Sequence, residues 1–440
     1  MHPYIPHTPE DEKEMLKVIG ISSMDDLYKE VPQSMRLGNS VPLPESKAET
    51  EVIEEISEMA EKNKKGTCFL GRGSYDHVVT SLGKTLSAIP EFVTSYTPYQ
   101  AEISQGMLEA IFEYQSMMTE LTGLDVSNAS LYDGASAVAE CASMMIDKKR
   151  KSNKVLVAET VNPLYLEVVK TWAFGKGIII DVVPSENGTV NLETVKKEWS
   201  SDTAGLIIQT PNRYGITENL QGFADFVHSE KGLFGISCDP LSLGLYKTPG
   251  EWGADIAIGD TQPLGLPLAF GGPYCGYMCV KNDLMRKIPG RIVGRTTDKD
   301  GKTAYVLTLQ AREQHIKRDR ASSNICSNES LSSLMTCIHL STLGWAGIEE
   351  AAEQSYVKAH YLEAELLKLG YKQAFDGPFW CEFALKFDNN SKAEHFIKEM
   401  KKYDIFAGVR EENLVVICVT ERRTQKELDC YIEKAGRIQK

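Results

Sequence analysis

The chain has 440 residues, of which 42% are hydrophobic and 25% charged, an ordinary composition for a globular protein. Its length exceeds one compact core and predicts a large domain together with a smaller one. A formal net charge of −13 argues against a general nucleic-acid-binding protein, because a negative surface repels polyanions.

No sorting signal, membrane span or metal site is evident. The N-terminus lacks the basic start and apolar run of a signal peptide. No stretch reaches the roughly 18 consecutive apolar residues that a membrane helix requires. The histidines show no ligand spacing, and Cys275 and Cys279 fit a strand with buried thiols better than a metal site. With no Cys-x-x-Cys pair among its ten cysteines, the chain is expected to be a cytoplasmic protein with reduced thiols.

Residues 1–65 predict a helical N-terminal arm. Thr8-Pro9-Glu10-Asp11 combines a capping hydroxyl, a first-turn proline and acids that favour a helix start, and Gly20 ends the helix. A connector spaced by prolines leads to a second helix near 45–63 with an apolar face. Such an arm buries little area alone, so we expect it to wrap a neighbouring subunit.

Between about 105 and 281, apolar strands alternate with amphipathic helices. A helix over 105–122 is apolar on most sides and is expected to be buried. Continuous runs of Val and Ile mark strands that are covered on both faces. The pattern predicts an α/β large domain over 66–328 with a mostly parallel, doubly wound sheet. The expected strands lie at 155–158, 177–183, 205–209, 233–238, 255–258 and 276–280.

A long helical stretch over about 329–369 leads into the last part of the chain. There the pattern alternates between short apolar strands and amphipathic helices. This predicts a small α+β domain over 329–440. Its strands are expected at 380–387, 405–409 and 414–419, and its helices at 391–402 and 424–438.

The segment around Asp239 has the pattern of half a pyridoxal-phosphate (PLP) site. One strand ends at Asp239, a second ends near Gln262, and a Gly-rich turn follows at 270–277. In such a site the Asp keeps the pyridine nitrogen protonated, and a lysine forms the Schiff base. No lysine occurs between Lys247 and Lys281, and the Gln262 amide cannot form an imine. We therefore expect a PLP-enzyme scaffold that lacks its nucleophile and needs a partner.

The turn at 131–136 opens a helix of small residues, where such a scaffold would hold a phosphate. The backbone N–H of Gly134 and the hydroxyl of Ser136 are suitable donors for an anion. An ordinary N-capped helix has the same pattern, and without a Schiff base PLP would be held weakly at best. We expect Asp239, Gly134 and Ser136 to be vestiges of a cofactor site.

Two further segments carry many polar groups. Residues 96–106 place two tyrosines and several hydrogen-bonding side chains around a proline, in a loop before the buried helix. Residues 309–324 are a local positive island that includes Arg312 and His315. The island is either a solvated helix face or a site for a carboxylate, a phosphate or an acidic partner surface.

Taken together, these segments resemble the glycine decarboxylase P-protein of the glycine cleavage system, in its N-terminal half. The chain also has the length of the separate first (alpha) subunit found in bacteria with a divided P-protein. In that family the PLP-bearing lysine belongs to the other half or subunit. The matching motifs are GRGSYDH (71–77), YTPYQAEISQG (96–106), FEYQSMM (112–118), ASLYDGASA (129–137), FGGP (270–273) and LQAREQHIKR (309–318).

The resemblance implies a fold type I, aspartate aminotransferase-like architecture and one subunit of a decarboxylating glycine dehydrogenase. PLP would be bound covalently by a homologous beta subunit, with two copies of each subunit in the complex. Glycine would lose CO2, and its aminomethyl group would pass to the lipoyl arm of H-protein. This chain, inactive alone, would wall the active site and the lipoyl channel. The implied wall residues are Tyr96, Tyr99, Gln100, Glu102, Ser104 and Gln105, with Arg312 and His315 as weaker candidates.

Two alternatives remain at the level of the sequence. In the first, the chain is an independent PLP-dependent decarboxylase or aminotransferase that uses another lysine. Lys247 is the first lysine after Asp239 in the sequence. Lys247 precedes the strand at 255–258 that should present the nucleophile, which argues against this role. The second alternative is a non-catalytic binding or scaffold protein that has kept a PLP-enzyme fold.

Overall fold

The computed structural model describes residues 4, 6–37, 41, 43–94, 97–149, 151–269 and 271–439. The chain divides into two compact units, Met1–Lys64 and Lys65–Lys440. The first unit contains the two predicted arm helices, α1 (Pro9–Ile19) and α2 (Glu49–Glu61). Thr8 caps α1 and Gly20 ends it with φ 84°, whereas α2 buries none of its residues within the described structure. That the arm wraps a neighbouring subunit stays a prediction.

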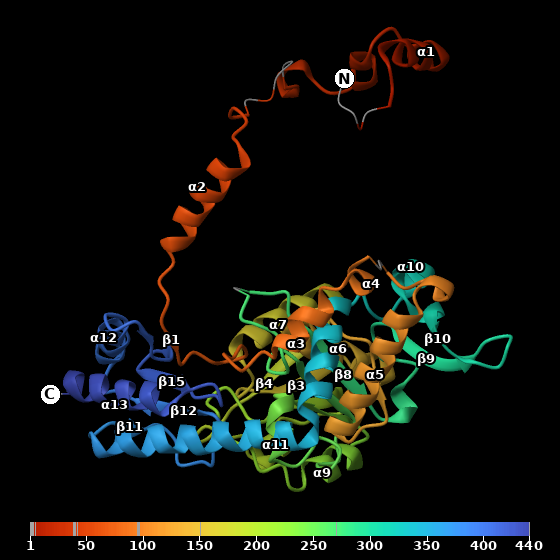
Figure 1. The fold of residues 1–440 in the computed structure, drawn as a ribbon. Helices are drawn as coiled ribbons and strands as arrows, with labels where there is room; N and C mark the ends of the chain where they lie inside the picture. The colour runs from red at the N-terminus through yellow and green to blue at the C-terminus, as the bar shows by residue number, and fades with distance from the viewer. Residues whose placement is uncertain are drawn as a thin grey trace. The chain divides into compact units, whose positions relative to one another are not determined.

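A seven-stranded sheet is the centre of the second unit, and it contains all six strands predicted for the large domain (Figure 1). Four neighbouring pairs are parallel, and β8 is antiparallel to both β7 and β2. The sheet is therefore mostly parallel, as predicted. In sheet order the strands are β2 (Val126–Ser127), β8 (Gly276–Val280), β7 (Ile256–Asp260), β6 (Leu233–Ser237), β5 (Thr203–Gln209), β3 (Lys154–Ala158) and β4 (Ile179–Val183).

Helices cover this sheet, and α5 and α6 pack against the strands near its β2 end. α5 (Gln105–Thr122) has the predicted bounds, and α6 (Gly134–Lys148) buries most of its small side chains. A two-stranded hairpin of β9 (Ile292–Thr297) and β10 (Thr303–Thr308) projects from the body (Figure 1). The remaining helices of this part are α3 (Ser81–Ser87), α4 (Pro90–Val93), α7 (Pro163–Lys176), α8 (Leu192–Glu198), α9 (Phe223–Ser229) and the short α10 (Gln314–Lys317).

The long helix α11 (Ser330–Lys368) leads to a four-stranded antiparallel sheet. Its strand order is β11-β12-β15-β14. The single strand predicted at 405–409 is wrong, because Gly408 has φ 136° and breaks it. β13 (Ile405–Phe406) pairs instead with β1 (Thr67–Cys68). The other elements are β11 (Lys372–Gln373), β12 (Glu382–Lys386), β14 (Val409–Glu411), β15 (Leu414–Cys418), α12 (Asn390–Lys401) and α13 (Gln425–Gln439).

Hydrophobic side chains of the second unit form one cluster around the large sheet and another around the C-terminal sheet. α11 contributes Ile348 and Ala352 to the first cluster and Leu362 and Leu366 to the second. The division into domains at 328/329 stays a prediction. Among the described residues, α11 is the one helix long and apolar enough to cross a membrane. Length and composition are weak evidence for a span, and Gly344 interrupts this helix with φ 61° and ψ −176°.

Candidate functional site

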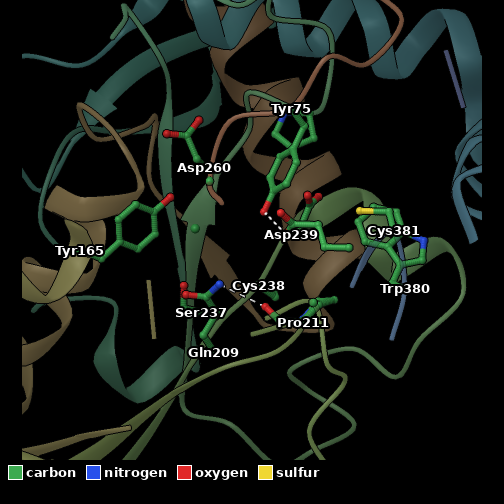
Figure 2. A pocket seen from close by; sticks show the side chains of 15 residues that line it. Tyr75, Tyr165, Gln209, Pro211, Ser237, Cys238, Asp239, Asp260, Trp380 and Cys381 are labelled. Carbon is green, nitrogen blue, oxygen red and sulfur yellow. Dashed lines mark hydrogen bonds between the residues drawn. The ribbon is translucent and has the colours of Figure 1, made fainter. Parts of the chain in front are cut away.

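A small cavity lies at the carboxyl ends of β6 and β7, where ligands bind in sheets of this kind. Figure 2 shows Asp239, Asp260 and Tyr75 around it, with Tyr165 and Trp380 on opposite sides. Its volume of about 30 Å³ is room for about two water molecules. The predicted Asp239 is thus at the expected place, but the space beside it is narrow.

Gln262 occupies the position where a Schiff-base lysine was sought, and its amide is fully used. Its Oε1 accepts a hydrogen bond from the backbone N–H of Tyr75 at 2.8 Å, and its Nε2 donates to the Tyr75 carbonyl at 2.8 Å. Nε2 also donates to the carbonyl of Leu266 at 3.0 Å. The side chain is completely buried. Gln262 therefore holds the loop at 71–77 on the sheet.

Lys247 does not replace the missing lysine. Its Nζ lies 4.6 Å from the ring centroid of Trp252 and lines a separate cavity of about 400 Å³. No lysine is among the described residues that line the cavity beside Asp239. The geometry therefore disfavours an independent PLP enzyme that uses Lys247.

Carboxylates take the N–H groups at the start of α6. The backbone N–H of Gly134 donates to Asp260 Oδ2 at 2.9 Å, and that of Ser136 donates to Asp133 Oδ1 at 2.7 Å. Asp260 Oδ1 also accepts from the backbone N–H of Gln262 at 2.8 Å. Two carboxylates at this position repel an anion and occupy its donors. The turn is thus an N-capped helix start, and a phosphate does not fit it.

Three acidic side chains beside the cavity have raised pKa values. Burial raises the pKa of Asp239 and of Asp260 to about 6 and that of Glu382 to about 7. Asp239 Oδ1 accepts from the backbone N–H of Leu241 at 2.9 Å, whereas Oδ2 is buried without a hydrogen-bond partner in the described structure. Burial disfavours the charged form of each acid, so this cavity suits neutral groups or cations better than phosphate.

The loop at 71–77 is also tied to the C-terminal part of the second unit. The hydroxyl of Tyr75 donates to Glu382 at 3.0 Å, and His77 Nδ1 lies 2.5 Å from Glu421. Burial lowers the pKa of His77, but the adjacent Glu421 carboxylate outweighs it and raises this pKa above its usual value. The loop at 71–77 therefore joins the large sheet, through Gln262, to Glu382 and Glu421 of the C-terminal part.

These residues do not fit PLP. In the part of the chain that the structure describes, no lysine lines the cavity, the amide of Gln262 is engaged by Tyr75, and Asp260 and Asp133 hold the helix start where phosphate would bind. Among the described residues, no group of three His, Cys, Asp or Glu side chains is placed to hold a metal. Cys275 directly precedes β8 and Cys279 lies within it, and both side chains are buried.

The polar loop before α5 brings some candidate residues together and separates others. Tyr99 and His315 meet edge to face with ring centroids 5.9 Å apart. Gln100 and Glu102 are exposed, and Ser104 is buried at the start of α5. Tyr96 lies outside the described residues. Of the predicted group, Tyr99 and His315 therefore form one local cluster.

Two candidates are occupied by main-chain contacts. Gln105 Nε2 donates to the carbonyl of Tyr305 at 2.9 Å, and its Oε1 accepts from the Tyr305 N–H at 2.9 Å. The guanidinium of Arg312 donates to the carbonyls of Ile288 and Gly290. Both side chains hold neighbouring backbone in place. Their predicted contact with a partner's site remains a hypothesis.

Sequence reasoning missed Asp260, Glu382 and Arg291. Asp260 ends β7 two residues before Gln262, so its place at a strand end was a usable signal. Glu382 accepts from the backbone N–H of Arg72 at 2.7 Å across 310 positions, a contact without a local signature. Arg291 donates to the hydroxyl of Tyr99 at 2.8 Å. The contacts of Glu382 and Arg291, unlike the position of Asp260, have no signal in the local pattern of their own segments.

The fold is that of fold type I PLP-dependent enzymes. A sphingosine-1-phosphate lyase from Burkholderia pseudomallei matches 93% of this chain and 94% of its own, with a TM-score of 0.68 at 15% identity. An alanine–glyoxylate aminotransferase from Nostoc matches 86% of this chain and 96% of its own, with a TM-score of 0.61 at 12% identity. At such identities the likeness concerns the architecture alone.

Closer similarities define the family. The family model of the glycine cleavage system P-protein matches residues 2–434, and the chain belongs to this family. A Geobacillus protein described as probable glycine dehydrogenase (decarboxylating) subunit 1 is 45% identical over 99% of each chain. A Carboxydothermus hydrogenoformans protein with that description is also 45% identical, over 98% of this chain and 99% of its own. A crystal structure of glycine decarboxylase (P-protein) in inhibitor-bound form has a TM-score of 0.90, 38% identity and 99% coverage of both chains.

Proposed function

We propose that the chain is the first subunit of a two-subunit glycine decarboxylase, and that the partner subunit holds PLP covalently. Family membership over residues 2–434 and 45% identity to proteins described as subunit 1 support the assignment. The word "subunit" in these descriptions implies a second chain. The resemblance drawn from the motifs at 71–77 and 96–106 points to the same enzyme.

The observation that carries the division between subunits is the engaged amide of Gln262. Loss of CO2 from an amino acid leaves an electron pair that needs an electron sink such as PLP. None of the described residues that line the cavity beside Asp239 supplies such a sink, and the cavity has room for about two water molecules. The cofactor therefore belongs on the partner, and this chain contributes shape and polar groups.

The role of this chain is to complete the wall of the partner's active site and the channel for the lipoyl arm of H-protein. The loop that contains Tyr99 is exposed at Gln100 and Glu102 and contacts His315 through Tyr99. Polar groups on an exposed loop with a rigid base are suited to a site completed by another chain. A wall of this kind also excludes water from the reacting carbon. The cytoplasmic complex contains two copies of each subunit and requires no membrane or nucleic acid.

The experiment is reconstitution from purified components. A homologous chain that carries a lysine at the position of Gln262 is mixed with PLP, lipoylated H-protein and isotopically labelled glycine. CO2 release is measured with and without the present chain. The proposal predicts release that requires this chain and that the chain alone does not produce. Equal release in its absence would overturn the proposal and favour a scaffold protein.

A further inference from the structure

Arg291 is a buried cation whose hydrogen-bond acceptors are all neutral. Its side chain donates to the Tyr99 hydroxyl at 2.8 Å, to Asn328 Oδ1 at 3.0 Å and to the carbonyl of Cys326 at 3.2 Å. The residue is 4% exposed, and its Nε has no hydrogen-bond partner in the described structure. No carboxylate forms an ion pair with it among the described residues. A buried charge without a counter-charge is costly, so fold stability alone does not account for an arginine here.

The backbone around Arg291 connects the Tyr99 loop to the start of α6. The carbonyl of Arg291 accepts from the N–H of Ala129 at 2.8 Å. The segment that receives its guanidinium is itself anchored, because the N–H of Cys326 donates to the Tyr132 hydroxyl at 3.0 Å. The N–H of Glu329 likewise donates to Ser130 Oγ at 2.9 Å. The guanidinium is thus held by a rigid base, whereas the Tyr99 side chain that it meets is 48% exposed.

The direction of the hydrogen bond determines what Tyr99 is able to do. The guanidinium is always the donor, so the phenol oxygen of Tyr99 is the acceptor in this pair. The hydroxyl hydrogen is therefore not used by Arg291 and is available to donate to another acceptor. The guanidinium also lies 4.9 Å from the centroid of the Tyr99 ring, which fixes the ring as well as the oxygen. Together these contacts make Tyr99 an oriented hydrogen-bond donor.

We propose that Arg291 is the positioning residue that aims the Tyr99 hydroxyl at an acceptor group in the active site completed by the two subunits. The proposal rests on the proposed function. Arg291 does not touch the reacting groups and acts through Tyr99. The arginine is needed because its planar fork reaches Tyr99, Asn328 and Cys326 at once, which a lysine does not do.

A double-mutant cycle on the reconstituted complex tests this role. Tyr99→Phe and Arg291→Met are each expected to lower kcat for glycine decarboxylation about tenfold or more, with little change in KM for glycine. If Arg291 acts through Tyr99, the double variant is no slower than the slower single variant. Arg295→Met, an exposed arginine on β9, is the matched control and is expected to keep the wild-type rate.

Two further measurements separate positioning from loss of folding. Hydrogen exchange of the 97–104 backbone in the complex is expected to rise in the Arg291 variants, while the melting temperature of the complex changes little. Arg291→Lys keeps the charge without the fork and is expected to lower kcat as well, so it carries the test where Arg291→Met does not assemble. Single effects that multiply in the double variant, or a fully active Arg291 variant, would overturn this inference alone. A wild-type chain that fails to stimulate decarboxylation would overturn the proposed function together with it.

Discussion

Gln262 and the backbone of Tyr75 form a closed pair, with both the N–H and the carbonyl of Tyr75 bonded to the same side-chain amide at 2.8 Å. A side chain that bonds both main-chain groups of another residue fixes the 71–77 loop, whose Gly73 and Tyr75 line the cavity. The position that could have held a nucleophile thus holds a loop that lines the cavity.

Restoring a lysine is not expected to restore cofactor binding. Gln262→Lys should give a chain without a visible PLP absorption band, because Asp260 and Asp133 still occupy the helix start and the cavity stays small. The substitution buries an ammonium and removes the bonds to Tyr75, so unfolding should need about 3 kcal/mol less free energy. Gln262→Met, which removes only the hydrogen bonds, is the control. A stable yellow Gln262→Lys chain, bleached by hydroxylamine, would show that the cavity accepts PLP.

The raised pKa of Asp239 predicts how the free energy of unfolding depends on pH. Its pKa is raised from 3.8 to about 6 in the folded chain, so the stability that it contributes is present below pH 4 and lost as pH rises through about 6. Asp239→Asn lacks this loss and should be about 1–3 kcal/mol more stable than the wild type at pH 8, with the difference vanishing towards pH 4. Urea unfolding at several pH values measures it, with exposed Asp300→Asn as the control. A less stable Asp239→Asn chain at pH 8 would show that the ionised carboxylate is favoured.

Gln105 is expected to matter for the hairpin. Its amide bonds both main-chain groups of Tyr305, and Gln115 does the same for Val293 at 2.9 Å on the neighbouring strand. Gln105→Ala should lower the free energy of unfolding by about 1–2 kcal/mol and raise hydrogen exchange in β10. Gln100→Ala, at an exposed position of the same loop, should leave both unchanged. Equal hydrogen exchange of β10 in the two variants would show that Gln105 does not hold the hairpin in place.

The strands and the closed site differ in how far they could be predicted. The parallel sheet could be predicted from continuous apolar runs such as Val155–Ala158 and Leu233–Cys238. Strands of a parallel sheet are covered on both faces, so their side chains are apolar at nearly every position. The lack of a lysine between Lys247 and Lys281 could also be seen in the sequence. The partners of Gln262 could not, because Tyr75 is 187 positions away. Gln105 was predicted as a site residue from its polarity, and this role stays a prediction. Its bonds to the Tyr305 backbone, 200 positions away, have no signal in the sequence.

The tyrosines of the polar loop give the clearest test of the wall. Changing Tyr96 and Tyr99 together to Phe keeps the rings and removes both hydroxyls, including the acceptor of Arg291. Glycine–CO2 exchange by the complex should fall about tenfold or more, while binding between the subunits persists. Tyr361→Phe, in the C-terminal half of α11, is the control. Unchanged glycine–CO2 exchange would show that this loop does not form part of the active-site wall.

On the proposed function, the PLP of the complex is held covalently by the partner subunit and not by this chain. Borohydride reduction of the reconstituted complex, followed by peptide mass spectrometry of both subunits, locates the covalently attached pyridoxyl group. We expect the label on one lysine of the partner subunit and none on this chain, including Lys247 in its separate cavity. Stoichiometric label on any lysine of this chain would show that this chain itself holds the cofactor and would overturn the proposed division between the subunits.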